Sequence, residues 1–155
     1  MDHHIRRQDR RIDDEEAYSI LAGGEFGVLS MCTVDDEPYA VPVNYAMCGK
    51  NIYIHCAAEG TKLNCIRYNN RVSFCVVGRT EMLPSKFSIK YESTIAYGTA
   101  VEAAGEEKRD ALLKIVEKYS PAHVSEGIQY INKSIDRASV IKISIDVVTG
   151  KARKT

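Results

Sequence analysis

Apolar residues near the start of the chain recur at the spacing of one helix face. Ala17, Ile20 and Leu21 share that face, and the acidic run before them suits the first turn of a helix. Asp13 can cap the helix, because an acidic residue follows three positions later, and Gly23-Gly24 can end it. We therefore predict a short helix from Asp13 to these glycines that packs on the body of the protein.

From residue 26 onwards the apolar and β-branched residues are arranged as in strands. The turn-forming pair Asp35-Asp36 predicts a hairpin between the first two strands. Pro42 cannot donate a backbone hydrogen bond, so its strand lies at an edge, at a bulge or against a ligand. In chain order, the predicted strands are 26–31, 39–45, 52–55, 71–77, 91–102 and 138–145.

Helical spacing returns between the strands. It predicts helices over residues 61–68, 105–119 and 125–132, with a loop at 82–86 and a turn at 148–151. The predicted fold class is therefore mainly β, with about six antiparallel strands and flanking helices. The first four strands, with one helix inserted among them, suggest a small barrel.

Length and charge distribution indicate one domain, residues 1–155. We expect residues 1–11 to form a mobile leader and residues 150–155 a basic tail. The leader segment Arg6-Arg7-Gln8-Asp9-Arg10-Arg11 is locally basic and could contact a phosphate or a partner chain. Asp9 and the acidic residues that follow dilute this charge, which favours a solvated tail.

The overall charge excludes some classes of partner. Lys+Arg and Asp+Glu number 21 each, so no strong field attracts nucleic acid. No apolar run approaches the roughly 20 residues that span a bilayer, and the N-terminus is charged where a signal peptide has an apolar core. We predict a cytoplasmic protein that binds neither nucleic acid nor a membrane.

The cysteines do not form a pattern of disulfides or metal ligands. Their number is odd and no CxxC pair occurs, so we expect free thiols in a reducing compartment and no metal site. They are Cys32, Cys48, Cys56, Cys65 and Cys75.

The junction between the third predicted strand and the next helix is the first candidate site. The strand ends at His55, Gly60 permits a tight backbone, and Thr61 could cap the helix. The unpaired N–H groups of the helix, together with Lys62, would suit an anion. The alternative is an ordinary strand-to-helix turn with a surface lysine.

Five segments, taken in their order and spacing, match one known family across nearly the whole chain. They are 26–30, 41–45, 53–62, 93–98 and 149–151. Together they resemble the flavin-binding split β-barrel proteins related to pyridoxamine 5′-phosphate oxidase, and most closely the nitroimidazole resistance (Nim) branch. With this resemblance we favour a phosphate site at Thr61 and Lys62.

The resemblance implies a homodimer of two split barrels, with flavin mononucleotide (FMN) in each of two clefts at the subunit interface. In such proteins the strand matching 41–45 runs beside the isoalloxazine ring, the 55–62 junction holds the phosphate and ribityl chain, and the 93–98 strand lies near the interface. FAD is the alternative cofactor. The cofactor-binding residues implied here are Pro42, Val43, Asn44, Tyr45, His55, Cys56, Ala57, Thr61, Lys62 and Ser93.

His55 is the one catalytic residue that we predict. It matches the histidine of the Nim motif, which lies beside the flavin and the substrate pocket in that branch. The resemblance makes it a candidate proton donor or substrate positioner, and imidazole suits proton supply near neutral pH. A structural histidine at a strand end is the alternative, because a flavin can pass a hydride without a protein acid.

Two departures separate this chain from the oxidase branch. Thr61-Lys62 stands where that branch tends to have an Arg-Lys pair, and the C-terminal region has no recognisable segment for pyridoxamine phosphate. Vitamin B6 oxidation is therefore the weaker interpretation. Other phosphate or substrate contacts, or else solvated surface charges, are Arg67, Arg71, Lys142 and Lys151.

The expected function is that of an FMN-dependent reductase of a small organic acceptor, such as a nitroimidazole or another nitroaromatic. NADH or NADPH is the expected electron donor, and the absence of a GxGxxG motif is consistent with a nicotinamide that binds only transiently. The alternatives are a non-enzymatic flavin carrier or sensor, a pyridoxamine-phosphate-oxidase-like enzyme, and a protein that binds haem or deazaflavin.

Overall fold

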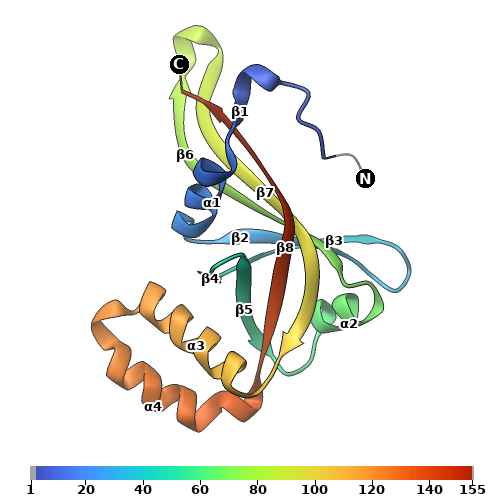
Figure 1. Ribbon diagram of the computed structural model, residues 1–155, viewed down its shortest axis with the longest axis vertical. Helices are drawn as coiled ribbons and strands as arrows, with labels where there is room; N and C mark the ends of the chain where they lie inside the picture. Colours follow the sequence, from blue (N-terminus) through green and yellow to red (C-terminus); the bar gives the residue numbers. More distant parts are fainter. Residues whose placement is uncertain (1–2, 155) are drawn as a thin grey trace.

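A computed structural model describes residues 3–154 and contains one antiparallel sheet of eight strands flanked by four helices (Figure 1). Six strands follow the order β3-β2-β6-β7-β8-β5, β4 is added beyond β5, and β1 pairs with β8. The strands are β1 Arg11–Ile12, β2 Gly27–Cys32, β3 Pro38–Val43, β4 Ala46–Cys48, β5 Asn51–Ala57, β6 Arg71–Leu83, β7 Ser88–Ala103 and β8 Ala138–Arg153. The helices are α1 Asp14–Gly23, α2 Thr61–Tyr68, α3 Gly105–Tyr119 and α4 Val124–Ser134.

The predicted fold class is confirmed, but the expected number of six strands is wrong. The two additional strands are β1 and β4, which are two and three residues long. Strands this short contain too few residues to show alternation. Pro42 lies in β3, which is an edge strand of the sheet. This is the first of the three alternatives predicted for it, namely an edge, a bulge or a ligand contact.

Helix α1 begins as its sequence predicts. The side chain of Asp13 accepts a hydrogen bond of 2.8 Å from the backbone N–H of Glu16, which caps the first turn. Ala17 and Leu21 are buried, and the helix packs on β6, β7 and β8. The carboxylate of Glu16 does not return to the cap but pairs with Lys154 at 2.7 Å.

Strand β8 runs nearly the whole length of the molecule (Figure 1). This corrects the turn predicted at 148–151 and the tail predicted at 150–155, because β8 continues to Arg153 between β7 and β1. Gly150 permits the close approach of β1 and α1 rather than a turn: a Cβ there would lie 2.6 Å from Cγ1 of Ile12 and 2.9 Å from Cβ of Ala17.

The expected leader of residues 1–11 is also shorter than predicted. Gln8–Arg10 forms one turn of 3-10 helix, and Arg11 lies in β1, opposite Lys151 of β8. Residues 1, 2 and 155 lie outside the described part of the chain, so the prediction for them stays untested.

The hairpin of β6 and β7 extends beyond its predicted ends. Pairing continues to Leu83 and Ser88, so the loop expected at 82–86 shortens to the single 3-10 turn Pro84–Lys86 and its flanking residue, while Met82 and Leu83 are strand. A bulge between Val77 and Thr80 bends the hairpin, which projects from one end of the molecule in Figure 1.

Two hydrophobic clusters lie on different faces of the structure. The larger cluster lies under α1 and α2 and contains Tyr45 and Phe74, whose rings meet edge to face with centroids 4.8 Å apart. The smaller cluster lies under α3 and α4 and includes Tyr53, Leu112 and Ile131. Strand β5 contributes side chains to both, which places it between the barrel core and the pair of helices.

Gly98 marks the closest contact between the two longest strands. It is buried in β7 beside an irregularity in the pairing with β8. A Cβ at this position would overlap the carbonyl oxygen of Ser144 and lie 2.9 Å from its carbonyl carbon. Only glycine fits here without moving the backbone.

Among the described residues, no helix is long and apolar enough to cross a membrane. The five cysteines have free thiols, and only Cys65 is fully buried.

Candidate functional site

Strand β5 presents alternate residues to opposite faces. Ile52 and Ile54 enter the large core, whereas Tyr53 belongs to the cluster under α3 and α4. His55 follows this alternation on the helix side and is exposed, while Cys56 packs against the large core. The structure thus places two neighbouring candidate residues on opposite faces of one strand.

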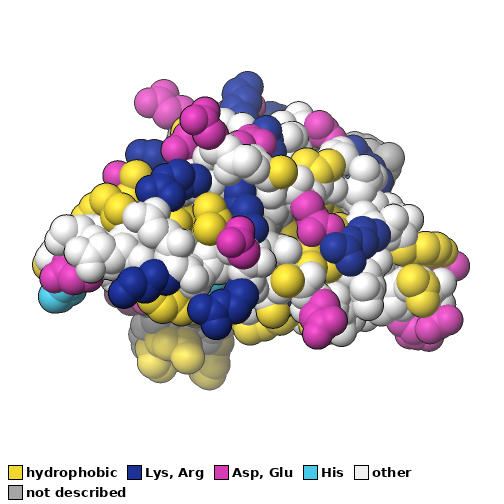
Figure 2. Space-filling view, turned by 90° about the horizontal axis from the view of Figure 1, so that it is seen from below, with side chains coloured by type: hydrophobic (Ala, Val, Ile, Leu, Met, Phe, Trp, Pro, Cys, Tyr) yellow, Lys and Arg dark blue, Asp and Glu magenta, His cyan; other side chains and the backbone are white. Residues whose placement is uncertain are grey.

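His55 lies at one end of a mainly apolar groove of about 570 Å³ between β5, the start of β8 and the two helices. Among the described residues, no hydrogen-bond partner contacts the imidazole. Figure 2 views the end of the molecule where α2, α3 and α4 lie and shows apolar, basic and acidic side chains interspersed. The other lining residues are Leu112, Ile115, Val116, Tyr130, Ile131, Lys133, Ser134, Arg137 and Ala138.

The helix that follows β5 begins with its N-terminal groups open. Gly60 is the N-cap residue with φ +135°, and no side chain caps the helix. Thr61 is therefore the first helical residue rather than the predicted cap, and its side chain is exposed. The first turn contains no acidic residue, so no carboxylate competes for its N–H groups.

Lys62 lies in the same turn and is half-buried. Burial raises the pKa of the Cys56 thiol, and the positive charge of Lys62 partly opposes this rise. The lysine is thus electrostatically coupled to the end of β5, with Ala57 exposed nearby on the same strand. Five candidate residues, His55, Cys56, Ala57, Thr61 and Lys62, are therefore brought together at the β5–α2 junction.

Three of the four other basic candidates are already paired. Arg67 bonds Glu102 at 2.6 Å, and Arg71 bonds Asp146 at 2.7 Å. Lys142 bonds Glu107, also at 2.6 Å. Pairing of this kind supports the surface-charge alternative for these three residues.

The β3 candidates lie apart from the junction. Pro42 is exposed opposite Val28 at the sheet edge, Asn44 is exposed just beyond the strand, and Val43 packs on the large core. Asn44 also lines a cavity of about 550 Å³ with Lys118. An edge strand can offer backbone groups to a ligand at these positions.

Tyr45 lies in the hydrophobic core, and its expected place beside a cofactor stays a prediction. Its ring is fully buried, and its hydroxyl donates to the carbonyl oxygen of Leu21. Its backbone N–H donates to the Tyr119 hydroxyl at 3.0 Å, and that hydroxyl donates its one proton to the carbonyl oxygen of Glu25 at 2.6 Å. Burial raises the pKa of Tyr45, so the phenol stays neutral. The sequence did not indicate the contact with Tyr119, because it joins residues 74 positions apart.

Ser93 is far from the junction within one chain. In the β7–β8 ladder, Ser93 pairs with Lys151. His55 of β5 pairs with Val140 of β8, and Val140 pairs on its other side with Ala103, which lies ten residues after Ser93 in β7. Ten residues of strand span roughly 33 Å. Ser93 and Lys151 instead line a cavity of about 340 Å³ with the N-terminal segment, including His3.

Beside the groove, a polar network joins β5, β8 and α3. The hydroxyl of Tyr53 donates to the carboxylate of Glu107 at 2.9 Å, and the ammonium of Lys142 donates to the same oxygen at 2.6 Å. The two bonds lower the pKa of Glu107, with the Lys142 bond contributing more. Burial and the bond to Glu107 raise the pKa of Tyr53 to about 12.

The raised pKa of Tyr53 predicts a loss of stability at alkaline pH. The ordinary tyrosine pKa is about 10, so between about pH 10 and 12 the unfolded chain loses a proton that the folded chain retains. The contribution is fully present below pH 10 and disappears as pH rises towards 12. In urea unfolding, wild type should lose up to about 1.4 kcal/mol more per pH unit in this range than Tyr53→Phe. Parallel curves for the two proteins would contradict this.

Within residues 3–154, no group of three or more His, Cys, Asp or Glu side chains is placed to hold a metal ion.

Comparison with known proteins identifies similar folds. A structure of a candidate 5-nitroimidazole antibiotic resistance protein from Bacteroides thetaiotaomicron is 23% identical, with a TM-score of 0.79 over 97% of this chain and 96% of that one. An FAD-binding protein from Mesorhizobium loti is 24% identical, with a TM-score of 0.65 over 94% and 98%. An FAD and haem binding protein from Mycobacterium smegmatis is 17% identical, with a TM-score of 0.76 over 94% and 74%.

Sequence comparison gives the family. An uncharacterized protein of Rhizobium meliloti is 29% identical over 102 residues, which are 57% of this chain and 66% of that protein. The family model described as pyridoxamine 5′-phosphate oxidase matches residues 13–152, from the cap of α1 almost to the end of β8. The expected family is thereby confirmed: the chain belongs to the pyridoxamine 5′-phosphate oxidase family.

Proposed function

We propose that this protein is an FMN-dependent oxidoreductase that reduces a small organic acceptor. The observation that carries the proposal is the β5–α2 junction, where an uncapped helix start and Lys62 follow the end of the strand that carries His55. Membership of the oxidase family and the similarity to flavin-binding structures support it. Bound there, the flavin would supply hydride or electron transfer.

The residues at the junction fit the phosphate end of a flavin. The first N–H groups of α2 are open, Thr61 adds a hydroxyl, and Lys62 adds a positive charge without an acid in the same turn. Together these groups match the charge and hydrogen-bond needs of a phosphomonoester. Since the turn carries one lysine, a single terminal phosphate suits it, which is why we prefer FMN over FAD.

His55 is proposed to hold the acceptor or supply it with a proton. Its imidazole reaches the groove and has no competing hydrogen-bond partner within residues 3–154. The apolar lining from α3 and α4 would limit the access of water to an organic acceptor, such as a nitroaromatic ring. Reduction of a nitro group consumes protons as well as electrons, and an exposed imidazole can provide them.

A two-chain site is proposed because one chain leaves the candidate residues apart. Ser93 lies roughly 33 Å along the sheet from the position linked to His55. Ser93, Ile95 and Tyr97 lie on one face of β7, are only half-buried, and line a cavity together with residues 3–6. A second copy packed on this face would cover it and could complete the flavin site. Light scattering should then give twice the monomer mass.

His55→Ala is expected to lower turnover without releasing flavin. The side chain lies on the groove side of β5, whereas the residues proposed to bind the phosphate lie beyond Gly60 in α2. We therefore expect at least tenfold slower acceptor reduction with near-normal flavin occupancy. Stopped-flow reoxidation of the reduced protein by a nitroimidazole measures this step. Cys48→Ala, at the exposed last residue of β4, is the matched control. Unchanged reoxidation in His55→Ala would remove the catalytic role.

One experiment tests the proposed function itself. The absorption spectrum and mass of the copurifying small molecule identify the cofactor, and a Soret band would indicate haem instead. The anaerobic flavin complex is then mixed with NADH or NADPH while the absorbance near 450 nm is followed. Rapid bleaching, with recovery after a nitroimidazole is added, is the expected result. No reduction by either donor would indicate a flavin carrier or sensor, and release of pyridoxal phosphate from pyridoxamine phosphate would indicate the oxidase reaction.

A further inference from the structure

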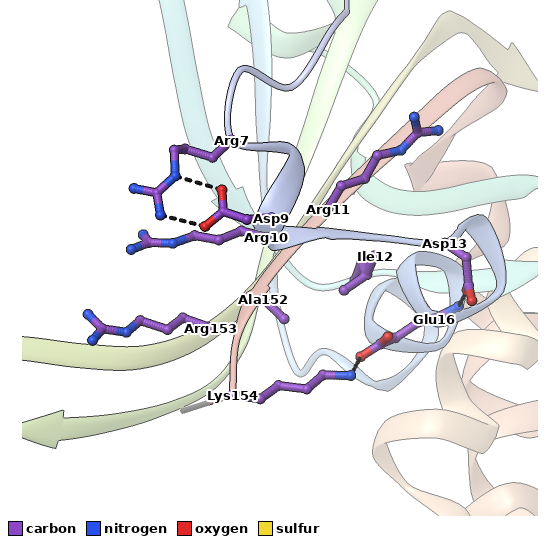
Figure 3. A pocket seen from close by; sticks show the side chains of 10 residues that line it. All are labelled: Arg7, Asp9, Arg10, Arg11, Ile12, Asp13, Glu16, Ala152, Arg153 and Lys154. Atoms are coloured by element: carbon purple, nitrogen blue, oxygen red, sulfur yellow. Dashed lines mark hydrogen bonds and ion pairs between the residues drawn. The ribbon is translucent and has the colours of Figure 1, made fainter.

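A basic pocket lies at the end of the molecule opposite α2, α3 and α4 (Figures 1 and 3). It has a volume of about 590 Å³ and is formed by the N-terminal turn, β1, the start of α1 and the end of β8. Five cationic side chains and three carboxylates line it, with Ile12 and Ala152 between them. These charged residues are Arg7, Arg10, Arg11, Arg153, Lys154, Asp9, Asp13 and Glu16.

All three carboxylates already have partners. Asp9 accepts two bonds from Arg7, at 2.6 and 2.8 Å, and Asp13 accepts the backbone N–H of Glu16 at 2.8 Å. Glu16 pairs with Lys154 at 2.7 Å. The bond from Arg7 lowers the pKa of Asp9 to about 2. Two of these acids are therefore bonded by Arg7 and Lys154, which are themselves lining cations, and the lining keeps two more cations than carboxylates.

Arg10 and Arg153 both lie beside Tyr91. Arg10 approaches the Tyr91 hydroxyl at 3.4 Å, and Tyr91 stands opposite Arg153 in the pairing of β7 with β8. Figure 3 shows Arg7, Arg10 and Arg153 extending towards the same side of the β1–β8 pair, whereas Arg11 points away. Three guanidinium groups from separate positions in the chain thus converge at one pocket.

We propose that this pocket binds a small phosphorylated molecule through Arg7, Arg10 and Arg153. Guanidinium groups present paired N–H donors that match phosphate oxygens, and they stay charged at any physiological pH. The balanced net charge and the mixed charges elsewhere argue for a small anion rather than a nucleic acid.

This site is separate from the phosphate cradle proposed at α2. Strand β8 pairs with the end of β5 at Ala138 and reaches the basic pocket at Arg153. Fifteen residues of strand span roughly 50 Å. One phosphate group therefore cannot occupy both places in one chain.

The test is a titration of the full chain with inorganic phosphate and with glycerol phosphate, in which NMR measures the backbone amide chemical shifts at each ligand concentration. We expect saturable shifts confined to the backbone of residues 7–11, Tyr91 and 152–154. The double variant Arg10→Gln/Arg153→Gln should bind at least tenfold more weakly, because charge-assisted bonds are lost. Arg79→Gln, whose side chain is 96% exposed on the other hairpin strand, is the matched control and should bind as wild type does.

Three outcomes would overturn the inference. Shifts that are spread over the surface and do not saturate would show only weak screening of charge. If the double variant bound phosphate as tightly as wild type and had an unchanged unfolding midpoint, Arg10 and Arg153 would be excluded as phosphate ligands. Tighter, strongly salt-dependent binding of a short single-stranded oligonucleotide would show a nucleic-acid surface instead. The wild-type shift map decides the first and third outcomes even if the double variant fails to fold.

Discussion

Gly98→Ala is expected to destabilise the protein by about 3 kcal/mol or more, or to prevent folding. The added methyl group would overlap the carbonyl oxygen of Ser144, which is backbone of the neighbouring strand. A flexible side chain could rotate away, but β8 is held by pairing with β7 and β5 on both sides and cannot. Urea unfolding followed by circular dichroism measures the change.

Gly23→Ala is the matched control. Gly23 ends α1, and no atom lies within 4 Å of the position that its Cβ would take. Alanine is the better helix former, so this variant should keep or gain up to about 1 kcal/mol of stability. An unchanged unfolding midpoint in Gly98→Ala would show that the backbones of β7 and β8 at Gly98 and Ser144 lie further apart than in this structure.

Lys62→Gln is expected to weaken FMN binding roughly 10- to 100-fold. A hydrogen bond to a charged group contributes about 1.5–3 kcal/mol, and 1.4 kcal/mol is a factor of ten in affinity. Lys62 is the one basic residue in the first turn of α2. Fluorescence quenching of FMN in titrations with apoprotein gives the dissociation constants of the wild-type protein and of Lys62→Gln.

Riboflavin provides the internal control for Lys62→Gln, because it lacks the phosphate. Its affinity should stay within about twofold of wild type if the lysine acts on the phosphate. Lys50→Gln, in the exposed turn between β4 and β5, should bind both ligands normally. Equal losses for FMN and riboflavin would place Lys62 elsewhere than at the phosphate.

Local signals predicted the helices and several turns. Asp13 caps α1 through its own side chain, and α2 and α3 have their predicted bounds, because start signals, apolar spacing and stop signals all lie within the segment. The hairpin at Asp35-Asp36 likewise depends on neighbouring residues, with Asp36 at φ +60°.

The prediction was wrong where distant residues, rather than the local sequence, determine the structure. Thr149-Gly150 is typical of a turn, yet β7 and β1 supply hydrogen-bond partners to both sides of β8 there. Gly150 is required by Ile12 and Ala17, which belong to the other end of the chain. No local pattern records such a requirement.

The candidate site was predictable only in part. The junction from His55 to Lys62 is continuous in sequence, so its geometry follows from a strand that runs into a helix. The groove needs α3 and α4 to fold over β5, and the buried place of Tyr45 needs Tyr119. These contacts arise from tertiary packing, which single-segment patterns do not contain.

Strand β8 has a consequence for synthesis on the ribosome. It is the only described strand that joins β7 to β5, so without it the sheet separates into β3-β2-β6-β7 and β5-β4. Its pairing with β1 closes a contact across about 140 residues of chain, as between Arg11 and Lys151. The nascent chain therefore exposes two unjoined half-sheets until residues 138–144, which pair β8 with β5, have left the exit tunnel, and chaperones that shield strand edges should bind it up to that moment.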